Sequence, residues 1–486
     1  MRQLELPLKK IKIVCTIGPA SDSPEVLERL IRNGMNVARL NFAHGDLDAH
    51  RCVIANIRAA AAAVGRRVAI MGDLPGPKMR IGRLADECIE LERDHRIVLR
   101  TDDIEGDCHR LSVSFRELTN VVAPGDTIYL NDGYIQLEVE RVKNVAVHCV
   151  VRVGGELRAF KGVNLPGIDL GSSAFTVADQ AFLRFAAEER LDAVSQSFVQ
   201  NAADVEVVRQ AAAALGYDPL IIAKVERARA VDELDAILAA ADGMMVARGD
   251  LGVEIPLEEV ALVQKRMIRL ANRLGKPVIT ATHMLESMID NRRPTRAEVT
   301  DVANAILDGT DCVMLSGETA IGRYPDEAVA VMARIARVTE PQCDARELLR
   351  HIEADRAADA LATEDLISLS IYRTVEALRP AAIVTPTMSG ATPRRISRFR
   401  VPMWIVAVSP SEATCQRLAF TYGVIAIHEA ARPASWEGYA YDWVQAHGVP
   451  GDLALLTHGS ATFHAGGTNE IRLVDLEQRP TGRSIW

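Results

Sequence analysis

The sequence predicts an α/β protein made of repeated strand–helix units, interrupted once by an all-β insert and followed by a second α/β unit. Three observations support this. Short apolar strands alternate with helix-length segments from Ile11 to Val338. The alternation breaks between Pro75 and Pro166, where short β-rich runs replace the helices, and it resumes after Pro341. Strict alternation of this kind is typical of a parallel sheet with right-handed crossovers.

The first units carry clear signals for where the first helix starts and stops. Ser23 is a good N-cap, Pro24 suits the first helical position, and Gly34 ends the helix. An alanine-rich helix follows at about 48–64. We expect the three strands before the insert at residues 11–18, 36–42 and 68–73.

Five further strands follow the insert, each with a helix after it. They are expected at residues 193–198, 219–224, 243–247, 277–281 and 311–315, with the last helix from about Asp326 to Val338. Eight strand–helix units that close on themselves are typical of a TIM (β/α)8 barrel, in which the chemistry lies at the C-terminal ends of the strands.

Two smaller units complete the prediction. The insert reads as a small β-barrel lid with strands at 96–100, 126–130, 135–142 and 146–153, and residues 161–167 form a hinge candidate at its exit. The last unit reads as an open α/β domain with strands at 381–385, 402–409, 423–427 and 452–457. The domains are therefore expected as barrel at 1–75 and 167–340, lid at 76–166, and C-terminal domain at 341–486.

Composition narrows the class of protein. Hydrophobic residues make up 48% and charged residues 25% of the chain, so disordered and fibrous classes do not fit. The net charge of −9 argues against general binding to nucleic acid or a membrane surface. No long apolar run or signal-like start is present, and the eight cysteines form no CxxC pair. We therefore expect a cytoplasmic protein with reduced thiols.

Polar side chains follow the predicted barrel strands where each one ends. Glu226 and Asp250 bring two carboxylates to this rim, with Lys224 and Arg248 beside them. Such a set suits a magnesium ion that is completed by a substrate's oxygens. Structural salt bridges at a sheet edge are the alternative. The rim residues recur strand after strand, which favours a metal-assisted site: Arg39, Asn41, Asp73, Ser197, Lys224, Glu226, Arg248, Asp250, Thr282 and Ser316–Glu318.

Two loops of the C-terminal domain contain small and hydroxyl residues, at 387–392 and 458–468. The first leads into a helix that starts near Pro393, so its amides, its hydroxyls and the helix N-terminus could hold a phosphate. An ordinary loop of a doubly wound sheet is the alternative.

Several long segments resemble the pyruvate kinase family, in the family's order and spacing over nearly the whole chain. They include KIVCTIGPAS, GMNVARLNFAHG, IIAKVE, MVARGDLGVEIP, ATHMLESMIDNRRPTRAEVTDVANAILDGTD and VMLSGETAIGRYP. The resemblance implies a glycolytic enzyme that transfers the phosphoryl group of phosphoenolpyruvate to ADP, giving pyruvate and ATP.

The resemblance also implies roles for individual residues. Glu226 and Asp250 would hold Mg²⁺ or Mn²⁺, and Lys224 and Arg39 would face the phosphoryl group in transfer. Thr282 would order the water that protonates the enolate. The carboxylate of the substrate would lie against Ala247, Arg248, Gly249, Asp250 and Thr282. The nucleotide, with a second magnesium ion, would reach Thr16, Pro19, Asn41, His44, Arg80 and Lys161 under a closing lid.

The chain departs from the family's usual pattern at the site for a monovalent cation. Potassium would lie among Asn41, Asp73 and two hydroxyl side chains, but these last two positions hold Ala43 and Leu74. The usual glutamate is Lys78, whose ammonium could act as an internal cation. We therefore hypothesise activity without potassium. The alternative is that Lys78 points to solvent and that potassium still binds through Asn41 and Asp73.

The resemblance further implies allosteric control by a phosphorylated small molecule and a homotetramer. The effector would bind Thr387, Ser389, Gly390 and Thr392. A sugar bisphosphate, a sugar monophosphate and a nucleotide would all suit such a loop.

Two other classes of function stay open at this point. One is a non-catalytic metabolite sensor, which is disfavoured because Arg39, Lys224, Glu226, Asp250 and Thr282 are all present. The other is a metal-dependent aldolase or lyase on a similar barrel. Lys224 and the lid argue against it, because enolate chemistry alone needs neither of them.

Overall fold

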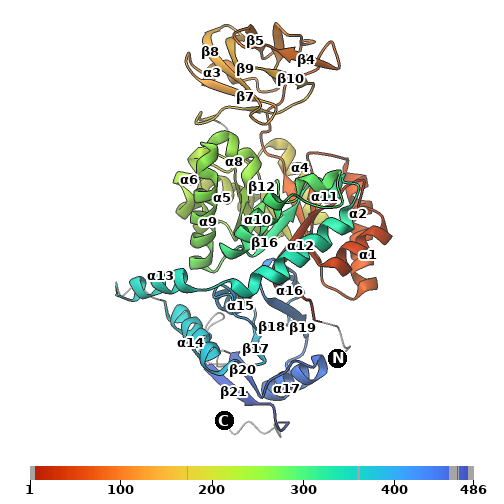
Figure 1. Ribbon diagram of the computed structural model, residues 1–486, viewed down its shortest axis with the longest axis vertical. Helices are drawn as coiled ribbons and strands as arrows, with labels where there is room; N and C mark the ends of the chain where they lie inside the picture. The colour runs from red at the N-terminus through yellow and green to blue at the C-terminus, as the bar shows by residue number, and fades with distance from the viewer. Residues whose placement is uncertain (1–5, 172, 358–361, 459–467, 469, 480–486) are drawn as a thin grey trace.

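The structure is a computed structural model that describes residues 6–171, 173–357, 362–458, 468 and 470–479. Three parts follow one another along the long axis of the molecule (Figure 1). The all-β insert lies at one end, the barrel in the middle, and the C-terminal sheet and its helices at the other end. The insert meets the barrel on the side of the rim, so the rim is the surface that the lid faces.

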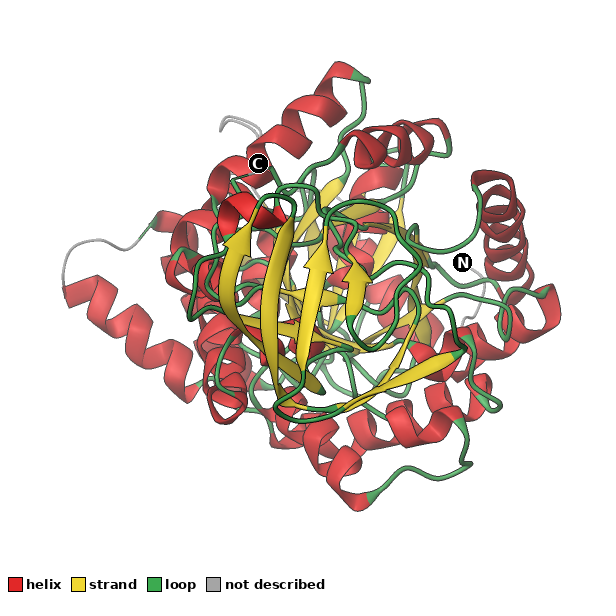
Figure 2. Ribbon diagram, turned by 90° about the horizontal axis from the view of Figure 1, so that it is seen from above, coloured by secondary structure: helices red, strands yellow, loops and turns green. Residues whose placement is uncertain are grey.

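The central part is a closed barrel of eight parallel strands, as the alternation predicts. In barrel order these are β1 (Lys12–Thr16), β16 (Cys312–Leu315), β15 (Val278–Ala281), β14 (Gly243–Ala247), β13 (Leu220–Val225), β12 (Ala193–Gln196), β3 (Ala69–Leu74) and β2 (Met35–Asn41). Figure 2 is seen from the end that carries the insert, whose strands lie in front, with helices around them. Every residue of β1, β3, β12 and β13 is buried, which explains why these strands read as continuous apolar runs.

The first helix of the barrel starts and stops where its capping residues predict. The Ser23 side chain accepts a hydrogen bond from the Val26 N–H, and Gly34 ends the helix with a φ of 119°. The barrel helices are α1 (Pro24–Asn33), α2 (Leu47–Val64), α4 (Val177–Glu188), α5 (Ala202–Ala214), α6 (Ala228–Asp232), α7 (Leu234–Ala240), α8 (Arg248–Glu254), α9 (Val260–Leu274), α10 (Arg296–Leu307), α11 (Gly317–Ala320) and α12 (Pro325–Thr339).

The insert contains two sheets around one apolar core. The larger has the order β11-β7-β8-β9-β5-β6, and the smaller pairs β10 with β4. The strands are β4 (Cys88–Leu91), β5 (Arg96–Arg100), β6 (Arg110–Ser112), β7 (Thr127–Leu130), β8 (Ile135–Lys143), β9 (Ala146–Val153), β10 (Gly155–Arg158) and β11 (Val163–Asn164), with the short helix α3 (Leu118–Val121) between β6 and β7.

The C-terminal part is an open five-stranded sheet with the order β19-β18-β17-β20-β21. Its strands are β17 (Ala382–Pro386), β18 (Trp404–Ser409), β19 (Val424–His428), β20 (Leu453–His458) and β21 (Glu470–Asp475). The edge strand β21 runs antiparallel to β20 and is not among the predicted strands. The helices are α13 (Arg346–Ala357), α14 (Thr363–Leu378), α15 (Ala391–Ser397), α16 (Glu412–Arg417) and α17 (Trp436–His447).

Within the part of the chain that the structure describes, no helix combines the length and the apolar character needed to cross a membrane.

Candidate active site

Asp73, near the end of β3, lies at the centre of a charged cluster on the rim. The Arg39 guanidinium contacts its carboxylate directly, Lys224 Nζ lies 3.3 Å from Oδ2, and Ser195 Oγ donates a hydrogen bond of 2.5 Å to Oδ1. Burial would raise the pKa of Asp73, but the charges of Arg39 and Lys224 and the Ser195 hydrogen bond outweigh it and hold the pKa at about 2. Asp73 is therefore ionised at neutral pH and fixes the two cations.

Lys224, on β13, joins this cluster to the carboxylates. Its Nζ lies 2.9 Å from Glu226 Oε1 and donates a hydrogen bond of 2.6 Å to Ser197 Oγ. Burial lowers the pKa of the Lys224 ammonium, but the attraction of Asp73 and Glu226 is larger in sum, so the pKa is raised above its ordinary value. A charged ammonium thus stands at the rim with a tenth of its side chain exposed.

Glu226 and Asp250 form the candidate metal site. Glu226 is 1% exposed, and its Oε2 accepts a hydrogen bond of 2.8 Å from the Phe198 N–H. Burial and the charge of Asp250, in the first turn of α8, both raise the pKa of Glu226 against the opposing charge of Lys224. Two like-charged carboxylates that oppose each other's ionisation fit a divalent cation between them.

This pair would need further oxygen ligands from a substrate or water. Among the described residues, no group of three or more histidine, cysteine, aspartate or glutamate side chains could hold a metal ion. Magnesium is commonly bound by one or two carboxylates and completed by substrate oxygens. The donor set therefore fits an ion that binds together with a substrate.

The predicted carboxylate-binding surface, Ala247 to Asp250, begins α8 directly after β14. The Arg248 side chain turns away from this surface: its guanidinium donates to the Thr282 carbonyl at 2.7 Å and to Asp301 Oδ1 at 2.6 Å. The backbone N–H groups of this first turn stay available, since a helix cannot pair its own first donors. Arg248 thus fixes the C-terminal end of β15. Its partner Asp301 was not among the predicted site residues.

Thr282, which follows β15, has a strained backbone. Its φ is 73°, a value that β-branched residues rarely adopt, and His283 follows with a φ of 55°. A Cβ on Gly249 would lie 2.8 Å from Thr282 Cγ2, so only glycine allows this approach. Strain of this kind at a rim position points to a functional residue.

The residues predicted for the nucleotide lie on both sides of the junction between barrel and lid. Thr16 Oγ1 accepts a hydrogen bond of 2.9 Å from Arg39 Nη1. The Arg80 guanidinium donates to the Phe160 carbonyl at 2.9 Å, and the Ile81 N–H donates to the Lys161 carbonyl, so the entry and exit of the lid run side by side.

His44 and Pro19 are both exposed and follow the barrel strands β2 and β1, respectively. Burial and the charges of Arg80, Lys78 and Arg39 lower the pKa of His44, so these cations gather around its ring. A positive cluster at the junction suits a nucleotide phosphate.

The residues predicted to bind a monovalent cation do not form a closed ligand shell in the structure. Asn41 Oδ1 accepts a hydrogen bond of 3.2 Å from the Ala43 N–H, and Leu74 is fully buried. Lys78 is exposed, and no hydrogen bond or ion pair joins its Nζ to another described residue. Its charge, with burial and the charges of Arg80 and Arg39, lowers the pKa of His44.

The predicted effector loop is closed on itself by local hydrogen bonds. Thr387 Oγ1 accepts from the Gly390 N–H at 2.9 Å, and Ser389 Oγ accepts from the Ala391 N–H at 3.4 Å. Thr392 Oγ1 lies 2.5 Å from Thr468 Oγ1. Of the second predicted loop, residues 459–467 lie outside the described residues.

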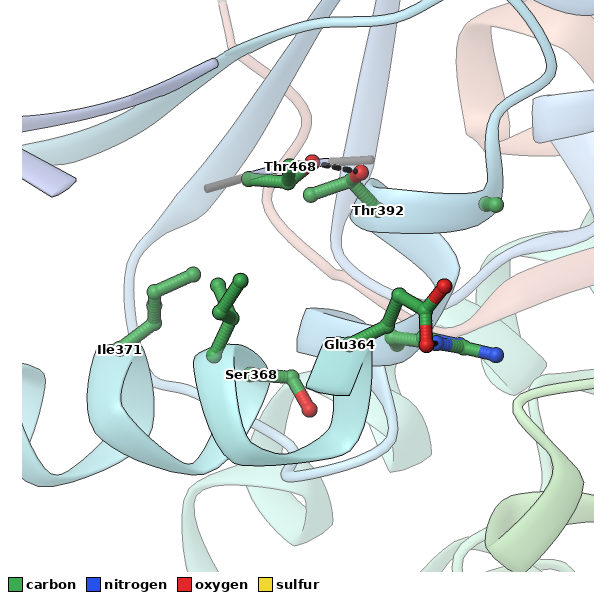
Figure 3. A pocket seen from close by; sticks show the side chains of 8 residues that line it. Glu364, Ser368, Ile371, Thr392 and Thr468 are labelled. Atoms are coloured by element: carbon green, nitrogen blue, oxygen red, sulfur yellow. Dashed lines mark hydrogen bonds and ion pairs between the residues drawn. The ribbon is translucent and has the colours of Figure 1, made fainter. Parts of the chain in front are cut away.

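A small pocket of about 110 Å³ lies beside Thr392 and Thr468. Figure 3 shows these two residues joined above a helix that bears Glu364, Ser368 and Ile371. The sequence prediction did not include this wall, because α14 is separated from the loop by strand β17 and carries no phosphate-binding signature.

Ser195 and Phe198 are functional partners that the sequence prediction missed. Ser195 could have been found, because it stands two residues before Ser197 on the same strand segment and alternate residues face the same side. The Phe198 contribution is a backbone N–H, and the side-chain pattern gives no sign of it.

Known proteins resemble the chain over nearly its whole length. The family model described as pyruvate kinase, barrel domain, matches residues 8–329, and that described as pyruvate kinase, alpha/beta domain, matches residues 365–474. A pyruvate kinase of Thermococcus litoralis is 46% identical over 481 residues, 97% of this chain and 100% of the relative. One of Geobacillus stearothermophilus is 45% identical, and one of Staphylococcus aureus 42%, each over 96% of this chain and 80% of the relative. The chain belongs to the pyruvate kinase family, whose members are phosphotransferases.

Proposed function

We propose that the chain transfers the phosphoryl group of phosphoenolpyruvate to ADP and so produces pyruvate and ATP in glycolysis. The observation that carries this proposal is the position of the Lys224 ammonium between Asp73 and Glu226, with Arg39 on the other side of Asp73. Phosphoryl transfer depends mainly on positioning and on neutralising charge. Two fixed cations beside a pair of carboxylates meet that need.

In this proposal Lys224 and Arg39 hold the phosphoryl oxygens while the bond to the enol oxygen breaks and the bond to an oxygen of ADP forms. Both side chains are about nine-tenths buried, so their charges act in a medium that screens them weakly. Asp73 keeps both in place before substrate arrives, which removes the cost of reorganising them.

Glu226 and Asp250 would hold the divalent ion, Mg²⁺ or Mn²⁺. When bound, the ion would neutralise the charge that develops on the carboxylate and enolate oxygens of the substrate. The N–H groups at the start of α8 orient the substrate carboxylate, and the side chain of Thr282, whose backbone is strained, orders the water that delivers a proton to the enolate carbon. Lid closure would exclude bulk water, which competes as a phosphoryl acceptor.

The nucleotide would bind across the junction of barrel and lid, at Thr16, Pro19, Asn41, His44, Arg80 and Lys161. Support comes from the charges of Arg80, Lys78 and Arg39, which act together on His44.

Potassium independence is part of the proposal. Leu74 offers no side-chain oxygen, and Lys78 adds a flexible positive charge near His44. On closing of the lid, that ammonium would take the place of the ion near Asn41 and Asp73.

Regulation by a phosphorylated small molecule at Thr387, Ser389, Gly390 and Thr392, and assembly into a homotetramer, complete the proposal. The pocket beside Thr392 supports the first of these.

The decisive experiment measures pyruvate formed from phosphoenolpyruvate and ADP with magnesium, first in potassium-free buffer and then with potassium added. Full activity without potassium is the expected result. Activity only with potassium would keep the reaction and refute the role of Lys78. No activity in either buffer, with sugar phosphates and AMP also present, would favour the sensor hypothesis.

A further inference from the structure

One buried ion pair joins the lid to the candidate metal site. Arg227, which directly follows Glu226, has its Nε 3.4 Å from Glu254 Oε2, and the two side chains are 4% and 1% exposed. Breaking a buried pair by removing one partner is costly, because the other charge stays buried without compensation. The Arg227–Glu254 pair therefore constrains the relative position of the two segments that it joins.

Arg227 reaches the exit of the lid with its remaining donors. Its Nη2 donates to the Ile168 carbonyl at 2.7 Å and approaches the Leu165 carbonyl at 3.5 Å. Leu165 belongs to the apolar core of the lid, and Ile168 packs against that core. The guanidinium thus holds the segment through which the lid returns to the barrel.

Glu254 ends α8, the helix that begins with the substrate-binding surface. Asp250 stands one turn earlier, at the i,i+4 spacing that places two side chains on neighbouring positions of one face. Burial raises the pKa of Glu254 to about 7, against the charge of Arg227 and the backbone N–H groups of Ala228 and of Gly167 in the lid exit, which lower it. Any displacement of the lid exit therefore acts on the helix that carries Asp250.

The lid touches the same helix at a second point. The turn between β7 and β8 contains Asn131 and Asp132, both with positive φ, followed by Gly133 with a φ of 91°. A Cβ on Gly133 would lie 3.3 Å from Val253 Cγ2. The tip of the turn and the lid exit thus both rest on the last turn of α8.

We propose that α8 transmits the position of the lid to the metal site and that Arg227 is the positioning residue that couples them. When the lid closes, the Arg227–Glu254 pair fixes the position of α8. Asp250 and the N–H groups at the start of α8 then come together into the positions in which they bind the metal ion and the substrate. This inference rests on the proposed function, since it takes Glu226 and Asp250 as the metal ligands and ADP as the ligand under the lid.

A neighbouring arginine provides a matched control. Arg229 holds the same segment from the surface, through an ion pair of 2.6 Å with Asp169 in which the two side chains are 52% and 62% exposed. Exposed ion pairs of this kind contribute little to stability. Arg229→Gln therefore removes a charge and a contact to the hinge segment while leaving the buried coupling in place.

The test compares Arg227→Gln, Arg227→Lys, Glu254→Gln and Arg229→Gln in the full chain, by steady-state kinetics and by hydrogen exchange of backbone amides. Arg227→Gln and Glu254→Gln are expected to raise the KM for ADP and to lower kcat by roughly ten- to a hundredfold, since a displacement of about 1 Å has effects of that size. Amide exchange should become faster in both segments 161–170 and 248–255. Arg227→Lys should recover part of kcat, and Arg229→Gln should stay within about twofold of wild type.

Two results would overturn the inference. One is that Arg227→Gln and Glu254→Gln behave like Arg229→Gln while wild type is active. The other is a fall in kcat with no change in the KM for ADP and faster exchange everywhere, which would mean general destabilisation. Glu254→Gln keeps the side-chain size, so it decides the matter if Arg227→Gln folds poorly. Failure of wild type to form pyruvate would refute the proposed function instead.

Discussion

Lys224 carries its charge in a position where burial alone would lower its pKa. The carboxylates of Asp73 and Glu226, 3.3 and 2.9 Å away, reverse that effect. Asp73 is held in turn by Ser195, which is invisible in any motif centred on Lys224. Catalysis at this site would therefore depend on a preorganised charge rather than on a single reactive group.

Replacing Lys224 should separate phosphoryl transfer from enolate chemistry. We expect Lys224→Met to lower phosphoryl transfer by at least about a thousandfold, because the ammonium neutralises charge only in that step. Metal-dependent exchange of the methyl protons of pyruvate with solvent should remain measurable, since it depends on Glu226, Asp250 and Thr282. Proton exchange followed by NMR checks this. Loss of both activities together would show that the division of roles is wrong.

Replacing Lys78 should create a need for potassium. We expect Lys78→Glu to lower activity in potassium-free buffer by about tenfold or more, with recovery on adding potassium, because a carboxylate restores a cation ligand where the ammonium stood. Lys143→Glu, an equally exposed lid lysine, serves as control and should not depend on potassium. A potassium response that is the same in wild type and in Lys78→Glu would contradict the hypothesis.

Among the helices and strands, the capping box of α4 both starts that helix and contacts the entry of the lid. The Thr176 side chain accepts from the Asp179 N–H, and Asp179 Oδ2 accepts from the Thr176 N–H at 2.7 Å. Asp179 Oδ1 also accepts from the Gly76 N–H at 3.1 Å. Since Gly76 stands where the chain enters the lid, the cap ties α4 to that entry as Arg227 ties α8 to the exit.

Removing this cap should cost a measurable part of the stability. We expect Thr176→Ala to lower the free energy of unfolding by about 1 kcal/mol, the usual size for loss of an N-cap. Thr300→Ala is the matched control, because Thr300 is exposed and lies within α10. Urea unfolding followed by circular dichroism measures both variants. An equal effect of the two would mean that the Thr176 cap is not stabilising.

At the scale of the whole molecule, the C-terminal sheet is anchored to the barrel by buried polar contacts. The Arg400 guanidinium lies 2.9 Å from Asp311 Oδ1, and the Tyr422 N–H donates to the same oxygen at 3.1 Å. Lys12, whose backbone N–H donates to the Asp311 carbonyl at 3.0 Å, also donates from its Nζ to the Val424 carbonyl at 2.7 Å. An effector bound in the C-terminal domain would act on the barrel through this interface.

The lysines near this interface predict a pH dependence of stability. Burial and the charge of Lys12 lower the pKa of Lys9 from 10.5 to about 7. The folded state then binds fewer protons than the unfolded chain between about pH 7 and 10.5, so stability should rise with pH through that window. We expect Lys9→Met to remove roughly 2 to 4 kcal/mol of this rise.

Urea unfolding at several pH values between 6.5 and 10 would measure the effect. Lys143→Met is the control, since that lysine is exposed and should leave the slope unchanged. Equal slopes for wild type and Lys9→Met would contradict the prediction.

The order of the elements and the chemical character of the rim could both be predicted from the sequence. Alternating apolar runs predicted the eight barrel strands, and Ser23 and Gly34 marked the ends of a helix, because capping and strand burial depend on neighbouring residues. The charged residues after the strands predicted the cluster, since parallel strands bring their C-terminal ends to one edge. The edge strand β21 escaped prediction because five of its six residues are exposed or charged and no long apolar run marks it.

Distances, burial and interaction partners depend on how the chain folds in three dimensions. Ser195 lies 122 residues from Asp73, and Arg227 lies 62 residues from Leu165, so no local pattern could pair them. The sequence does not show whether the Lys78 side chain is buried or exposed, and in the fold it is exposed. Packing brings these groups within a few ångströms and removes water from around them. That change of surroundings, rather than residue identity, sets the charge of Lys224 and Asp73 and connects the lid to the metal site.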